Sequence, residues 1–119
     1  MVFSFQAFAR TIQIPPDIIN AFNEGDSKRL IQYCKNQLDL VITNQERSLC
    51  NKSEGARLLE NFFNTNVPIK FDIKHQGGEG NAVFVIGQLI TSNGNYRITL
   101  FIEKSSNDFK ISQLRIKRE

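Results

Sequence analysis

The sequence is poor in the residues that build metal and nucleophile sites, because it holds a single histidine, His75, and only two cysteines, Cys34 and Cys50. One histidine cannot form a histidine-based metal centre, the two cysteines fit no metal-ligand spacing, and no carboxylate cluster stands beside His75 in the sequence. We therefore expect no metal and no cofactor. No apolar stretch approaches the roughly twenty residues that cross a bilayer, which argues against an integral membrane segment.

The chain also lacks a strong excess of charge. Its net charge of +3 and pI near 9.0 give only weak, salt-sensitive attraction to polyanions, and no run interleaves basic with aromatic residues. Nucleic acid is therefore not an expected partner. Lysines alternate with apolar residues, which is typical of a solvated outer sheet face, at Lys70, Lys74, Lys104 and Lys110. The cluster of Arg115, Lys117 and Arg118 is interpreted as a frayed basic end.

The length and composition indicate one domain. A chain of 119 residues with 40% hydrophobic and 23% charged residues is ordinary globular material with a single core. Residues 1–9 read MVFSFQAFA, an apolar run that ends in a small-x-small triplet and resembles the last part of a signal peptide. We assign residues 1–13 to a remnant of an export signal, or to a frayed segment, and residues 14–119 to the domain. This predicts an exported, periplasmic or envelope-associated protein, with a cytoplasmic one as the alternative.

The two cysteines are assigned by position. Cys34 follows Leu30 and Ile31 at helical spacing, which predicts a core position, whereas Cys50 precedes a helix start and could be exposed. In an exported protein a bridge between Cys34 and Cys50 could form, and mass measurement with and without reductant would detect it.

Three helices are predicted in the first half of the chain. The sequence Ile14-Pro15-Pro16-Asp17 starts the first helix, which Gly25 ends, and Asp26 caps a short second helix that stops near Asn36. Asn51, with Glu54 three residues on, starts a third helix that runs to about Asn64. Their apolar positions recur at helical spacing: Ile18, Ile19 and Phe22; Leu30, Ile31, Tyr33 and Cys34; Ala56, Leu59, Phe62 and Phe63.

The rest of the chain reads as strands. Alternation of apolar and polar residues predicts a strand over 37–43, and a brief strand is expected over 48–50. Richness in β-branched and aromatic residues predicts strands over 69–76, 82–91, 96–104 and 109–117. The short polar links 77–80, 92–95 and 105–108 make the last four strands an antiparallel meander. The glycines of the first link, Gly77, Gly78 and Gly80, have no strand-loop-helix context, so they indicate a hairpin turn and not a phosphate site.

Residues 21–31 (AFNEGDSKRLI), followed by 37–41 (QLDLV), resemble the opening of nuclear transport factor two-like proteins, the cystatin-like cone superfamily. The segments 14–16 (IPP), 75–77 (HQG), 91–97 (TSNGNYR) and 113–116 (QLRI) resemble an exported domain-of-unknown-function family of Bacteroidetes. The resemblance covers nearly everything after Ile14. It implies an α+β fold, with three N-terminal helices packed on a curved antiparallel sheet, and supplies no activity.

The cone fold implies a pocket between the helices and the concave face of the sheet. Alternation places Ile69, Phe71, Ile73 and His75 on that face and turns Lys70, Asp72 and Lys74 outward. The candidate ligand-pocket residues are His75, Tyr96, Tyr33, Phe22 and Phe71. His75 would serve there for proton transfer or ligand binding, or would only satisfy a turn. Asp39 falls on the polar side of its strand and is expected to face solvent.

Two functions are consistent with these residues. The first is a non-catalytic binding module of the cell envelope that holds a small apolar ligand or a protein partner. The alternative is a small-molecule isomerase or lyase that uses His75 with Tyr96. The two-sided apolar strand around Val83, Val85, Gly87 and Leu89 further predicts a homodimer through the sheet. Phenylalanines are numerous enough to fill the cone instead: Phe22, Phe62, Phe63, Phe71, Phe84 and Phe101.

Overall fold

The computed structural model describes residues 13–106 and 108–119. The elements follow in the order α1 (Pro16–Glu24), α2 (Ser27–Gln32), β1 (Cys34–Ile42), β2 (Ser48–Cys50), α3 (Lys52–Thr65), β3 (Pro68–Glu79), β4 (Ala82–Thr91), β5 (Gly94–Ser105) and β6 (Asp108–Arg118). The predicted segment 1–13 lies, except for Gln13, outside the described residues. No helix in the described part of the chain combines the length and the hydropathy that a membrane crossing needs.

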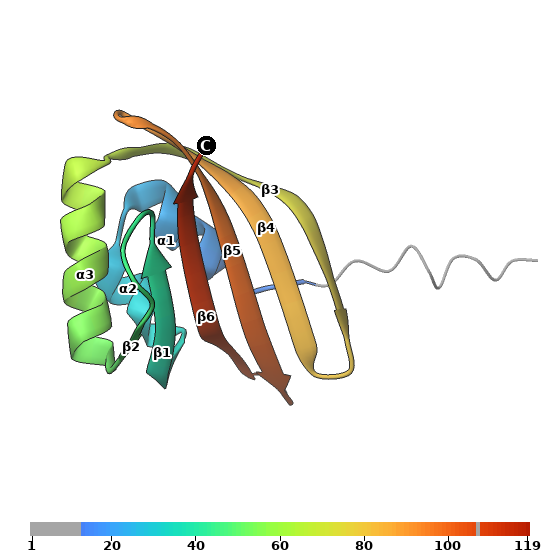
Figure 1. Ribbon diagram of the computed structural model, residues 1–119. Helices are drawn as coiled ribbons and strands as arrows, with labels where there is room; N and C mark the ends of the chain where they lie inside the picture. The colour runs from blue at the N-terminus through green and yellow to red at the C-terminus, as the bar shows by residue number, and fades with distance from the viewer. Residues whose placement is uncertain (1–12, 107) are drawn as a thin grey trace, which may run out of the picture.

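The six strands form one bent sheet in the order β2-β1-β6-β5-β4-β3 (Figure 1). The predicted α+β class is confirmed, and β3 to β6 form the predicted antiparallel meander. The sheet is mixed and not wholly antiparallel, because β1 runs parallel to β6. The chain enters this pairing as soon as α2 ends, where the amide of Ile111 donates to the Tyr33 carbonyl at 2.7 Å.

The helix ends follow the capping residues that the sequence offers. Gly25 ends α1 in the left-handed conformation, with φ of 64°, where a side chain would be strained. The Asp26 carboxylate accepts the Arg29 amide at the start of α2, and the Asn51 side chain accepts the Glu54 amide at the start of α3. One boundary was predicted wrongly: α2 ends at Gln32, and Cys34 begins β1 because its backbone pairs with Ile111.

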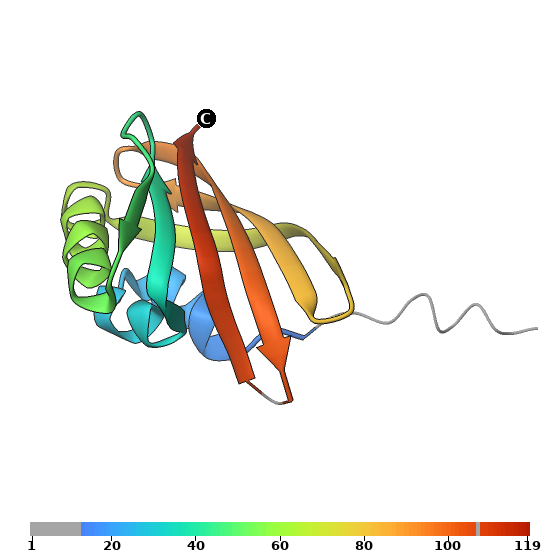
Figure 2. The same cartoon turned by 60° about the horizontal axis from the view of Figure 1, so that its bottom comes forward.

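The helices cover one face of the sheet, which we call the concave face, and leave the opposite, convex face uncovered (Figures 1 and 2). In the turned view β3 curls away from the other strands toward α3 (Figure 2). Inward-facing residues of β4, β5 and β6 share the core in register, since Val85 pairs with Leu100 and Leu100 with Leu114, and all three are fully buried. The core therefore lies between the concave face and the helices.

Two irregularities in β3 decide which side chains reach the core. The β3–β4 register shifts once between Pro68 and Lys70 and again between Ile73 and His75. An extra residue in one strand reverses the side-chain alternation beyond it, and it increases the local bend. The two shifts therefore change the face that each β3 side chain occupies, which simple alternation along the sequence does not anticipate.

Candidate functional site

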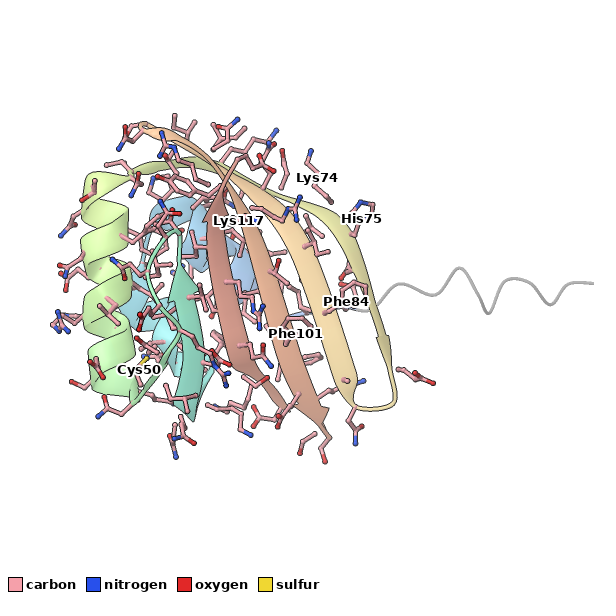
Figure 3. All side chains as sticks on the ribbon, in the orientation of Figure 1. Cys50, Lys74, His75, Phe84, Phe101 and Lys117 are labelled. Carbon is pink, nitrogen blue, oxygen red and sulfur yellow. The ribbon has the colours of Figure 1, made fainter. Side chains whose placement is uncertain are left out.

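His75 does not lie in the cone. The second shift in β3 leaves Lys74 without a partner on β4, so Ile73 pairs with Gly87 and His75 pairs with Ile86. Gly87 belongs to the concave face and Ile86 to the convex face, and His75 is exposed. Figure 3 shows Lys74 and His75 at the β3 side of the sheet, away from the helices. The prediction that His75 shares a face with Phe71 is wrong, because the bulge at Lys74 turns the strand over.

Tyr96 lies on the concave face and is 4% exposed, but its hydroxyl already forms two hydrogen bonds within the protein. It donates to Oδ1 of Asn66 at 2.8 Å and accepts from Nη1 of Arg118 at 2.6 Å. Tyr96 pairs with Leu89 on β4, whereas His75 pairs with Ile86, so the two side chains lie on opposite faces of the sheet. The predicted His75 and Tyr96 pair for proton transfer is therefore not assembled.

Tyr33 is also outside the cone. It follows α2 directly, and its hydroxyl donates to Oδ2 of Asp17 on α1 at 3.0 Å. This hydrogen bond to a carboxylate raises the pKa of Tyr33, since removing the proton would leave two negative groups in contact. The contact holds α1 against the end of α2 at the surface.

Phenylalanine rings fill the interior of the cone. Phe22 is fully buried and stacks on Phe71 with ring centroids 4.7 Å apart, and Phe63 meets Phe22 edge to face at 6.4 Å. Phe62 packs in the same way on Tyr96 at 5.0 Å. Phe22 and Phe71 are thus core residues, and each buried ring contributes about 1.5–3 kcal/mol to stability. Side chains thus occupy the space around Phe22 and Phe71 where a ligand was expected, and a hollow of about 280 Å³ remains between α3 and the end of β1.

Asp39 points to the convex side, as the alternation predicted, but it is not solvated. Its side chain is 9% exposed because Arg47 covers it, with Nε 2.9 Å from Oδ2. The other carboxylate oxygen, Oδ1, is buried without a hydrogen-bond partner among the described residues. The expectation that Asp39 faces solvent is therefore wrong, and the Arg47 contact is the reason.

The convex face carries two aromatic side chains near the β3–β4 hairpin. Phe84 on β4 and Phe101 on β5 stand directly opposite each other and are 36% and 38% exposed. Ile86 and Thr99 form the next pair on this face and are half-buried. Figure 3 shows the two phenylalanines side by side on the side of the sheet away from the helices. We call this pair of rings the phenylalanine pair.

Basic side chains flank the phenylalanine pair. Arg97 on β5 stands opposite Lys117 on β6, and Arg115 stands opposite Thr99, one step nearer to the rings. The guanidinium of Arg115 lies 5.9 Å from the centre of the Phe101 ring. Arg115 and Lys117 belong to β6, so the interpretation of this cluster as a frayed basic end is wrong. Two shallow hollows adjoin the face, one of about 390 Å³ beside Phe84 and Phe101 and one of about 360 Å³ beside His75 and Arg97.

Comparison with known proteins shows to which family this chain belongs. The family model described as domain of unknown function (DUF4783) matches residues 15–117. The chain belongs to the DUF4783 family. A DUF4783 protein of known structure from Bacteroides ovatus is 34% identical, with a TM-score of 0.83 over 89% of this chain and 96% of that one. No curated protein matches the sequence.

More distant structures share the expected fold. A protein of cystatin-like fold from Nostoc punctiforme is 13% identical, with a TM-score of 0.68 over 98% of this chain and 75% of that one. A ketosteroid isomerase-like protein from Erwinia carotovora atroseptica is 16% identical, with a TM-score of 0.69 over 87% and 88% of the two chains. At these identities the likeness concerns the fold alone, and the DUF4783 chain has the nuclear transport factor two-like cone.

The thiols of the DUF4783 chain are not part of a site. Both cysteines are free and buried, and each Sγ contacts a backbone carbonyl at 3.6 Å, Cys34 that of Leu30 and Cys50 that of Leu38. The core position of Cys34 is confirmed, whereas Cys50 is buried and not exposed. Burial raises the pKa of Cys34 to about 12 and also raises that of Cys50, so both thiols stay protonated at neutral pH.

The sequence assigned Phe84 and Phe101 to the core, so the convex site was missed. A signal for it was present in the turn at Ser92 and Asn93. A two-residue turn sets the register of its hairpin, and counting outward from the observed Thr91 and Gly94 pair brings Phe84 opposite Phe101. Because Val83 and Val85 flank Phe84 and face the core, the same count turns both rings outward.

Proposed function

We propose that this protein is a non-catalytic binding module of the cell envelope that docks another protein on the convex face of its sheet. The observation that carries the proposal is the phenylalanine pair, two large apolar side chains about one third exposed on the uncovered face of the sheet. Aromatic side chains are enriched among the residues that dominate protein interfaces. The filled cone, with Phe22 stacked on Phe71, favours this surface over an internal ligand.

The dimer prediction refers to the same surface but was argued from other residues. Val83, Val85, Gly87 and Leu89 face the core and cannot form a contact between molecules. The apolar groups that reach the convex face from β4 are Ala82, Phe84, Ile86 and Ile90. A second copy of the chain therefore stays a predicted occupant of the convex face, and light scattering tests it.

An enzymatic function receives no support from the geometry. The fold is shared with a ketosteroid isomerase-like protein, but fold does not select an activity. General acid and base groups must reach one substrate from the same cavity. His75 and Tyr96 lie on opposite faces of the sheet, and the Tyr96 hydroxyl already binds Asn66 and Arg118.

Site-specific photo-crosslinking tests the docking surface. A photoreactive amino acid would be placed at Thr99, next to the phenylalanine pair, and in a control at Ser53, which is exposed on α3. In cells of the source organism we expect a discrete crosslinked protein from position 99 and none from position 53. The crosslink should disappear when Phe84→Thr and Phe101→Thr are combined. Equal products from both positions, or a product that survives the double substitution, would reject the proposal.

The envelope location is a separate part of the proposal and has its own test. It is supported by the apolar run and small-x-small triplet of residues 1–9, which lie outside the described residues. Cell fractionation with a tag after residue 119 would locate the protein. Recovery in the cytoplasmic fraction would reject the location and leave the docking surface untouched.

A further inference from the structure

The convex face carries positive charge that the protein itself does not balance. Arg97 and Lys117 are both exposed and stand directly opposite each other on β5 and β6. Like charges in this position destabilise a sheet. No carboxylate of residues 13–106 and 108–119 lies within ion-pair distance of Arg97, Arg115 or Lys117. The arrangement costs stability in the isolated chain, which is the usual sign of groups placed for a partner.

Ion pairs balance some of the other charged groups of the same sheet, although Lys74, Lys104 and Lys110 form none within the described residues. Ion pairs are present between Lys70 and Asp72 at 3.5 Å, between Lys35 and Glu103 at 3.0 Å, and between Arg47 and Asp39 at 2.9 Å. The one carboxylate in the hollow beside Arg97 is that of Glu119, which accepts from Nε2 of Gln88 at 2.8 Å. Three cations without an ion pair in the described part of the chain, Arg97, Arg115 and Lys117, thus lie together on the convex face, whereas the hollow beside the phenylalanine pair holds one carboxylate, that of Glu79. The complement of the three cations is a negatively charged surface.

Each of the two rings has a neighbour within the protein. An added Cβ at Gly77 would lie 2.8 Å from Cε1 of Phe84, which shows that the Phe84 ring rests on the Gly77 backbone. The Phe101 ring has the Arg115 guanidinium beside it at 5.9 Å. Nucleic-acid bases stack on free aromatic faces, and here one face of Phe84 is covered and Phe101 already has a cation beside it. Apolar side chains of a partner protein need no free ring face, because any exposed apolar area of Phe84 and Phe101 gives them a contact.

We propose that the convex face binds an acidic segment of a partner protein, with apolar side chains of the segment on Phe84 and Phe101 and its carboxylates on Arg97, Arg115 and Lys117. This rests on the proposed docking function and names the chemistry of the partner. A second copy of the chain is disfavoured, because a two-fold axis would bring the basic face against itself.

The test measures binding by fluorescence anisotropy with labelled peptides of defined sequence. The probe is a dodecapeptide that alternates glutamate with leucine and phenylalanine, and its control replaces every glutamate by glutamine. The informative variant is Lys117→Glu, because it places opposite charges across β5 and β6 and should raise the melting temperature by about 2 °C. Lys28→Glu, on the exposed side of α2, makes the same change in net charge away from the convex face.

We expect the glutamate peptide to bind at least about tenfold more tightly than the glutamine peptide, and added salt to reduce the difference. Lys117→Glu should weaken its binding by about tenfold while stabilising the fold, and Lys28→Glu should leave it unchanged. A merely structural role of Lys117 cannot produce both effects. Combined Phe84→Thr and Phe101→Thr should abolish binding of the glutamate peptide.

Several results would overturn the proposal. If both peptides bind equally and Lys117→Glu has no effect, the proposal of an acidic partner is rejected, whereas the proposal of a docking surface stands. Equal crosslinked products from positions 99 and 53 would instead reject the docking function itself. Binding of an oligothymidylate that depends on Phe84 and Phe101 would assign the face to nucleic acid. A dimer in light scattering that Phe84→Thr dissociates would assign it to a second copy, and absence of binding by every probe would also reject the acidic segment.

Discussion

The closure of the cone can be tested at Gly87, where the β4 backbone meets the Phe71 ring. A Cβ added at Gly87 would lie 2.6 Å from Cε1 and 2.7 Å from Cζ of Phe71, and 2.8 Å from the backbone oxygen of Asp72. Phe71 cannot move aside freely, because it is 4% exposed and stacks on Phe22. The Asp72 carbonyl belongs to the neighbouring strand and can shift only with that strand. We therefore expect Gly87→Ala to be strongly destabilising.

The expected size of the effect follows from the rigidity of these neighbours. Adding atoms to a well-packed core costs about 1–3 kcal/mol, and a clash with backbone belongs at the upper end. At an unfolding entropy of about 2.1 cal/mol/K per residue, a chain of 119 residues has about 0.25 kcal/mol/K. A loss of about 3 kcal/mol therefore lowers the melting temperature by about 12 °C. Thermal and urea unfolding would both measure it.

Gly77→Ala is the matched control on the adjacent strand. Its added Cβ would come within 2.8 Å of Phe84, which is as close as the contacts at Gly87, but Phe84 is 36% exposed and its ring can turn toward solvent. We expect a loss below about 1 kcal/mol. Similar losses at both positions, or a loss at Gly87 below about 1 kcal/mol, would refute the description of a rigid, ring-filled cone.

Three further predictions concern the core and its polar groups. Tyr96→Phe should cost about 1–3 kcal/mol in urea unfolding, because it leaves the buried Oδ1 of Asn66 without its donor; a loss below about 0.5 kcal/mol would contradict this. Phe71→Ala should cost about 3–5 kcal/mol and open a cavity that takes up benzene, which the unsubstituted protein should not do in thermal-shift or NMR titrations. The pKa of Cys34 is raised to about 12 from 9.0, so the folded state keeps a proton that the unfolded state loses, and stability should fall as the pH rises from about 9 toward 12. Cys34→Ala should flatten this alkaline slope, and an unchanged slope would show that other groups cause it.

The local structure of this chain could be predicted because its causes are local. Gly25, Asp26 and Asn51 set helix ends by capping groups within a few residues, and each stands where the sequence predicted it. Alternation and the content of β-branched and aromatic residues predicted the six strands, although β1 begins earlier than expected, and short polar links predicted the meander. The resemblance of segments spread over residues 14–116 predicted the family, which the match over 15–117 confirms, and the fold, which the structure confirms.

The site could not be predicted in the same way, because it depends on the pairing of distant strands. A single extra residue at Lys74 moved His75 from the concave to the convex face, and a bulge forms only against the partner strand β4. The parallel pairing of β1 with β6 also joins segments that are far apart in the sequence. In the same way, Arg97 meets Lys117 only once β5 and β6 are in register.

By itself, the sequence determined the helices, the strands and the supply of phenylalanines, since propensity, capping and periodicity act over a few residues. Only the tertiary structure decided how those phenylalanines are divided. Phe22 and Phe71 close the cone, whereas Phe84 and Phe101 stand outside on the convex face. The physical reason is that a side chain's face is set by strand register and bulges, which are properties of paired backbones and not of one strand read alone.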